Sequence, residues 1–161
     1  MKINRFNLFL RLQISCVNGR IENVNVVIIG DFLKWGIYMT FEERKAQVKS
    51  YLGKRVVIGI DRPIGYVHEK ESYSLTYPIN YGYIPGVLGG DDEELDVYLL
   101  GVNEPVVEYE CEIIAIVHRH NDVEDKLVGA PIGLIFTKEE IKTAIHFQEQ
   151  YYDSEIEVIK R

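Results

Sequence analysis

The chain has 161 residues, of which 47% are apolar, so it is long enough for one domain with a hydrophobic core. Its formal net charge of −7 argues against a surface that holds a nucleic acid backbone by counterion release. No apolar run is long enough to span a bilayer, so we expect no membrane segment.

The cysteines and the N-terminal residues indicate the cellular compartment in which the protein is found. Cys16 and Cys111 lie far apart and form neither a metal motif nor a disulfide framework, which favours a reducing cytoplasm. Arg11 and Gln13 interrupt the apolar residues near the N-terminus, and no small-residue cleavage site follows. We therefore expect no secretion signal and a cytoplasmic protein.

Residues 1–38 differ from the rest of the chain in charge. They hold five basic and two acidic residues, whereas the remainder holds 13 basic and 23 acidic residues. Residues 24–29 read as a short strand without a clear partner. We predict that residues 1–38 are an extension of uncertain order and that residues 39–161 form the folded domain.

A capping-box pattern opens the orderly part of the chain. Thr40 is followed three residues later by Glu43, which predicts a helix that runs to about Tyr51 and ends at Gly53.

Short β-rich runs separated by turn signals follow this helix, with no further helix between them. This spacing indicates a sandwich or a closed barrel. The runs cover residues 56–60, 96–100, 110–117 and 126–130.

A second capping box stands near the C-terminus. Thr137 and Glu140 have the same spacing as the first pair, and they predict a helix that runs to about Tyr152.

The stretch most informative about chemistry is YPINYGYIPG, residues 77–86, followed by GDDEELDV, residues 90–97. Five carboxylates fall within six residues at the start of a predicted strand. Asp91 and Glu93 alternate in the turn and Asp96 begins the strand, so their oxygens can converge on a hard divalent ion such as Mg²⁺. A solvated acidic turn is the alternative interpretation.

Taken together, these stretches resemble the soluble, family I inorganic pyrophosphatases. That family carries Tyr-Pro-x-Asn-Tyr-Gly-Tyr and then Asp-x-Asp-Pro-x-Asp, where this chain has Glu93 and Glu94 at the third and fourth signature positions. Residues 124–131, EDKLVGAP, resemble the family's Asp-x-Lys-Leu-Val-Ala-x-Pro strand, and residues 146–153, HFQEQYYD, resemble its C-terminal helix. The resemblance covers about residues 54–155.

The resemblance implies an α+β, mainly β fold: a small OB-like, five-stranded β-barrel with a C-terminal helix and a short N-terminal helix. It implies Mg²⁺-dependent hydrolysis of inorganic diphosphate to two phosphates by a metal-activated water, with Glu93 as the general base. It also suggests a homo-oligomer. The implied metal ligands are Asp91, Asp96, Glu124 and, from a loop that does not align, Asp122. The residues implied to hold substrate are Tyr77, Tyr81, Lys126 and Tyr151.

The chain departs from the family at positions that bear on activity. Gly59 stands where the family has an acidic residue, Tyr152 replaces the usual lysine, and the hairpin over residues 63–76 is shortened. Phosphoryl transfer depends on cations placed against the phosphate oxygens, and Lys126 is the one clearly matching cation. Arg62, Lys70 and Arg119 are the candidates to replace the missing cations. Their spacing in the sequence does not show which of them does so.

Two alternatives therefore stay open. The first is a hydrolase of another small diphosphate compound, and the second is a catalytically weak barrel that binds phosphate metabolites or a protein partner. A zinc site is also conceivable at His118 and His120, which share one face of a strand. Because no third ligand is in sight, we expect surface or strand-end histidines there.

Overall fold

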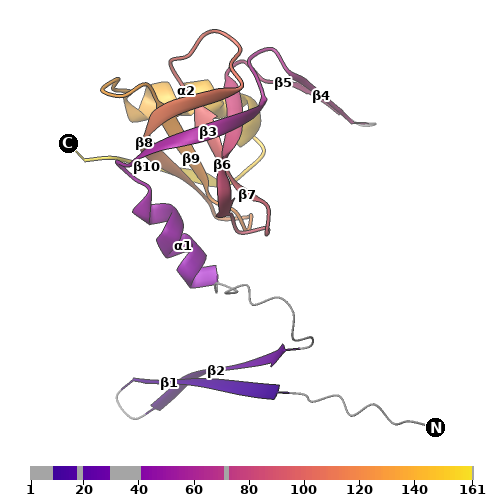
Figure 1. Ribbon diagram of the computed structural model, residues 1–161, viewed down its shortest axis with the longest axis vertical. Helices are drawn as coiled ribbons and strands as arrows, with labels where there is room; N and C mark the ends of the chain where they lie inside the picture. Colours follow the sequence, from indigo (N-terminus) through magenta and orange to yellow (C-terminus); the bar gives the residue numbers. More distant parts are fainter. Residues whose placement is uncertain (1–8, 18–19, 30–40, 71–72, 161) are drawn as a thin grey trace. The chain divides into compact units, whose positions relative to one another are not determined.

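The computed structural model describes residues 9–17, 20–29, 41–70 and 73–160 (Figure 1). The chain divides into two compact units, Met1–Tyr38 and Met39–Arg161.

The first unit contains an antiparallel pair of strands, β1 (Phe9–Val17) and β2 (Arg20–Ile29). The strand expected at residues 24–29 therefore exists and has a partner, which the sequence interpretation missed. Residues 10–16 alternate apolar and polar types with the period of a strand, and this signal could have identified the partner.

The second unit is a closed barrel (Figure 1). Its sheet has the order β10-β8-β3-β6-β7-β9, and the additional pairing of β8 with β9 closes five of the six strands into a ring. β7 and β9 are parallel, and the other pairs are antiparallel. The predicted five-stranded, OB-like, mainly β fold is confirmed. The strands are β3 (Arg55–Arg62), β6 (Asn80–Leu88), β7 (Glu94–Leu99), β8 (Glu108–Arg119), β9 (Lys126–Ala130) and β10 (Ser154–Val158).

The four β-rich runs expected from the sequence coincide with β3, β7, β8 and β9. The sequence interpretation missed β6, because its glycines and proline read as turn signals, and the short β10. The shortened hairpin forms a pair of four-residue strands, β4 (Val67–Lys70) and β5 (Tyr73–Thr76), which project from the barrel in Figure 1.

Two helices accompany the barrel, as predicted. The first, α1 (Phe41–Ser50), is followed by Gly53, whose φ of +81° suits a residue without a side chain. The capping residue expected at Thr40 lies outside the described residues. No helix of the described part of the chain is long and apolar enough to cross a membrane.

The second helix, α2 (Lys138–Glu149), begins with the predicted capping box. The Thr137 hydroxyl accepts a hydrogen bond from the Glu140 amide at 3.2 Å, and the Glu140 carboxylate accepts one from the Thr137 amide at 2.7 Å. Ile141 and Ile145 are buried in a core cluster with residues of the barrel wall. This packing fixes α2 over one side of the barrel, where the aromatic residues of the site lie.

His118 connects three strand ends. Its Nδ1 lies 2.8 Å from Asp125 Oδ2, just before β9, and its Nε2 lies 3.1 Å from Glu157 Oε2 on β10. Burial alone would lower the pKa of His118, but the hydrogen bonds to the two carboxylates outweigh it and the pKa is raised.

We predict that His118 gives the free energy of unfolding a pH dependence. A histidine whose pKa is raised by folding stabilises fully below its unfolded pKa of about 6.5, and the contribution is lost as pH rises through the folded pKa. Urea unfolding of the wild type and of His118→Asn should differ by about 1 kcal/mol at pH 5.5 and by less at pH 8.5. A difference that stays constant over this range would contradict the prediction.

Candidate active site

Asp91 and Glu93, two of the carboxylates singled out from the sequence, lie on an ordered turn between β6 and β7, and Asp96 lies on β7. The Gly89 amide donates to the Glu93 carbonyl at 2.7 Å, and the Glu93 amide donates to Asp91 Oδ1 at 3.0 Å. Asp92 has a φ of +70°, a left-handed conformation that aspartate tolerates better than most residues. The backbone of the turn is thus fixed by its own hydrogen bonds.

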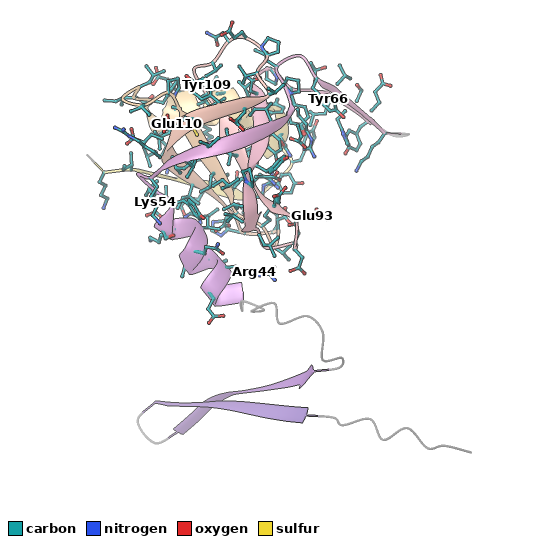
Figure 2. The ribbon with its side chains drawn as sticks, in the orientation of Figure 1. Arg44, Lys54, Tyr66, Glu93, Tyr109 and Glu110 are labelled. Carbon is teal, nitrogen blue, oxygen red and sulfur yellow. The ribbon has the colours of Figure 1, made fainter. Side chains whose placement is uncertain are left out.

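Arg44 on α1 holds this turn from outside. Its Nη1 donates to the carbonyls of Gly89 and Gly90 at 2.9 and 3.3 Å, and its Nη2 forms an ion pair with Asp92. Figure 2 labels Arg44 on α1 and Glu93 on the turn. The sequence interpretation missed Arg44, because a basic residue in a polar helix usually faces solvent and no local pattern identifies its distant partner.

The same turn packs closely on the residues that precede β9. A Cβ added to Gly90 would lie 1.8 Å from the Val123 carbonyl oxygen, and one added to Gly89 would lie 2.8 Å from Glu124 Oε1. Only glycine allows the backbone to approach this closely. The acidic turn therefore faces Glu124 directly.

Lys126 is the centre of the candidate site. The parallel pairing of Val97 with Leu127 sets Asp96 beside Lys126 on neighbouring strands. The ammonium of Lys126 donates to Glu124 Oε2 at 2.7 Å and forms an ion pair with Asp96. The side chains of Lys126 and Glu124 are only 4% and 6% exposed, so each charge depends on its partner in a medium that solvates it poorly. The structure thus brings together three residues that the sequence predicted for the site.

Negative charge is in excess around Glu124. Burial raises the pKa of its carboxyl, Lys126 opposes this change, and the nearby carboxylates of Asp96 and Asp91 raise the pKa further. Its Oε1 is buried and has no hydrogen-bond partner among the described residues. A cation at this oxygen would satisfy it and reduce the repulsion.

These carboxylates are hard oxygen donors of the kind that Mg²⁺ takes, and the unpaired Glu124 oxygen fits such an ion. In the described ranges, however, no group of three His, Cys, Asp or Glu side chains is already arranged to hold a metal. The ammonium of Lys126 provides the positive charge between Asp96 and Glu124 instead.

Tyrosines packed edge to face border the carboxylates. Tyr77 and Tyr81 meet edge to face at 5.4 Å between ring centroids, and Lys126 Nζ lies 5.8 Å from the Tyr81 centroid. The Tyr81 hydroxyl is fully buried and has no hydrogen-bond partner in the described part of the chain. Burial, and then the nearby Asp96, raises its pKa far above the ordinary range, so Tyr81 keeps its proton and can donate a hydrogen bond to an oxyanion.

Other predicted residues are not joined to this cluster. Asp122 accepts a hydrogen bond from Arg119 Nη1 at 3.0 Å and another from the Val123 amide at 2.8 Å. Tyr151 follows α2 with 69% of its surface exposed, and within residues 73–160 no hydrogen bond or ring contact joins it to Tyr81. Their roles stay predictions.

The structure also accounts for two departures from the family pattern. A Cβ on Gly59 would lie 3.1 Å from the Tyr83 ring, so the tyrosine covers this position. The Tyr152 ring lies under the Arg119 guanidinium, 3.6 Å from its carbon to the ring centroid. At both positions an aromatic ring therefore packs where the family pattern has a charged side chain.

Comparison with known proteins shows to which family the chain is similar. Residues 48–157 match the family model "Inorganic pyrophosphatase". The chain is 30% identical over 120 residues to the inorganic pyrophosphatase of Rickettsia prowazekii, an alignment that covers 58% of this chain and 69% of that protein. It is 28% identical over 147 residues to that of Rickettsia conorii, covering 73% and 84%. The crystal structure of inorganic pyrophosphatase from Ehrlichia chaffeensis shares the fold, with a TM-score of 0.52 and 18% identity over 67% of this chain and 88% of that one.

We predict that Arg44→Gln loosens the acidic turn. The variant loses the ion pair to Asp92 and the strong donors to Gly89 and Gly90, which together stabilise the turn by about 1 kcal/mol. Hydrogen exchange of the Gly89 amide, measured by NMR, should then be about fivefold faster.

Arg55→Gln is the matched control, because Arg55 is an exposed arginine on β3. Equal Gly89 exchange in wild type and Arg44→Gln would show that the turn does not depend on this clamp.

Proposed function

The chain belongs to the inorganic pyrophosphatase family, and we propose that it hydrolyses inorganic diphosphate to two phosphates with Mg²⁺ as cofactor. The observation that carries the proposal is the contact of the buried Lys126 with the buried Glu124 and the half-buried Asp96, beside the acidic turn. It places carboxylates, a cation and a neutral hydroxyl donor within one small region, as phosphoryl transfer requires.

In this proposal Asp91, Asp96 and Glu124 hold Mg²⁺. The bound ion lowers the pKa of a water and offsets phosphate charge. The unpaired Glu124 Oε1 and the mutual repulsion of these carboxylates support their role as ligands. Asp122 belongs to the predicted set as well, although both its oxygens already accept hydrogen bonds.

Glu93 serves as the general base. It lies on the exposed tip of the turn, where its side chain can reach water, and the bond from its amide to Asp91 fixes its backbone. A carboxylate in this place can accept the proton of the attacking water.

Lys126 and Tyr81 hold phosphate oxygens. An ammonium has three donors, and Lys126 uses two of them for Asp96 and Glu124, so one is available to substrate. The Tyr81 hydroxyl is near the Asp96 carboxylate but forms no hydrogen bond to a described residue, so it can donate one to substrate. Tyr77 borders the same region, and Tyr151 completes the predicted set from the turn after α2.

The proposal keeps the remaining predictions from the sequence: a cytoplasmic location, a homo-oligomer and no nucleic acid partner. If the substrate is another small diphosphate compound, or if the protein binds without turnover, the phosphate assay will show no release from inorganic diphosphate.

We predict that the purified full chain releases phosphate from diphosphate in Mg²⁺ and that excess EDTA abolishes the release. Because general-base catalysis contributes about 10²- to 10⁴-fold, Glu93→Gln should lower kcat at least about 100-fold. A colorimetric phosphate assay measures the rate, and urea unfolding checks that the variant is folded.

Glu110→Gln is the control, since it removes the charge of an exposed glutamate on β8. Full activity of Glu93→Gln would remove Glu93 from the mechanism. A folded wild type that releases no phosphate from diphosphate in Mg²⁺ would contradict the proposed function itself.

A further inference from the structure

Apart from the Mg²⁺ of the proposed function, the side chains of the proposed site offer little free positive charge to the substrate. Diphosphate is a polyanion, yet the charge of Lys126 is already opposed by Asp96 and Glu124, with Asp91 nearby. Stabilising a transferring phosphoryl group requires further cations on its oxygens. Three basic residues were candidates from the sequence, and the structure distinguishes among them.

Arg119 is committed elsewhere. Its guanidinium donates to Glu149 at 2.5 Å and to Asp122 at 3.0 Å, and it stacks on Tyr152. Its side chain is only 2% exposed. Because these partners offset its charge and cover its surface, Arg119 is a structural residue.

Lys70 belongs to the projecting β4–β5 hairpin. Its Nζ lies 5.7 Å from the Tyr73 ring centroid on the same hairpin. In the part of the chain that the structure describes, no hydrogen bond, ion pair or cation–π contact joins Lys70 to Tyr77 or Tyr81. Lys70 is therefore not held at the site.

Arg62 at the end of β3 lies against the tyrosines that border the site. Its guanidinium carbon is 5.0 Å from the Tyr81 ring centroid and 5.4 Å from that of Tyr77. Its Nη1 donates to the Tyr77 hydroxyl at 2.8 Å. Arg62 and Lys126 thus both lie within 6 Å of the centroid of one buried ring, that of Tyr81.

Most donors of Arg62 are unused. A guanidinium carries five N–H groups, and the bond to Tyr77 is the one hydrogen bond that the described residues accept from it. Asp61 approaches Nε to 3.7 Å, which is too long for a hydrogen bond. The side chain is 30% exposed, so a ligand can reach the remaining donors.

We infer that Arg62 binds a phosphoryl group of the substrate and supplies a cation that the shortened hairpin lacks, with Tyr77 as the residue that positions it. The inference rests on the proposed function. The planar fork of the guanidinium matches two oxygens of one phosphoryl group, which a lysine cannot do. The sequence named three candidates for such a cation, and Arg62 is the one whose position in the structure fits substrate binding.

The test compares Arg62→Gln, Arg62→Lys and the control Arg55→Gln in the full chain. Calorimetry in Mg²⁺ measures binding of methylenebisphosphonate, a diphosphate analogue that is not hydrolysed, and steady-state assays give KM and kcat for diphosphate. We expect Arg62→Gln to weaken analogue binding about 10- to 100-fold, because it removes charged hydrogen bonds. Arg62→Lys should lie between wild type and Arg62→Gln, and Arg55→Gln should match wild type.

Tyr77→Phe tests the positioning bond. It removes the hydroxyl that orients Arg62 but keeps the ring, so analogue binding should weaken only about threefold. In Arg62→Gln this change should have no further effect, because the group it orients is gone.

The outcomes separate this inference from the proposed function. The role of Arg62 alone would be overturned if the wild type binds the analogue and hydrolyses diphosphate, and Arg62→Gln has the same analogue affinity and the same KM for diphosphate. Wild type that neither binds nor hydrolyses would overturn both. If Arg62→Gln does not fold, Arg62→Lys decides, and unchanged analogue affinity in that variant overturns the inference.

Discussion

The buried ammonium of Lys126, held between Asp96 and Glu124, is the interaction on which the rest of the site depends. It lies at the start of β9, where the parallel pairing with β7 brings Asp96 to it, and Glu124 lies two residues before it in the chain. Removing one member of a buried ion pair costs on the order of 3–5 kcal/mol, because it leaves an uncompensated charge. The fold and the chemistry of the site are therefore fixed by the same contacts.

The other features of the site follow from this centre. The acidic turn must approach Glu124, which requires Gly89 and Gly90, and the approach is secured by Arg44 from α1. The family match begins at residue 48, so Arg44 lies outside it. Burial raises the pKa of Glu124, and the nearby carboxylates of Asp96 and Asp91 raise it further against the opposing effect of Lys126. This excess of carboxylates is the physical reason for expecting both a metal ion and Arg62 to act on the substrate.

The sequence predicted the parts of this arrangement that local patterns encode. The capping box of Thr137 and Glu140, the four β-rich runs, and the motifs that contain Asp96 and Lys126 all agree with the structure. β6 was missed because its two glycines and its proline are typical of turns, although here they lie within a strand of the barrel. Arg44 and Arg62 could not be placed, because each contacts residues distant in sequence that only the tertiary structure brings near.

The most direct test of the account is whether Asp96, which follows the acidic turn on β7, and Glu124, which precedes β9, bind one shared ion. Calorimetric titration of Mg²⁺ into the full chain, Asp96→Asn, Glu124→Gln and the control Asp92→Asn measures this sharing. Asp92 belongs to the same turn but is paired with Arg44, and asparagine keeps an acceptor oxygen and tolerates its left-handed backbone. The account predicts that Asp96→Asn and Glu124→Gln each weaken Mg²⁺ binding at least about tenfold, while Asp92→Asn binds like wild type. Equal affinity in all four proteins would contradict it.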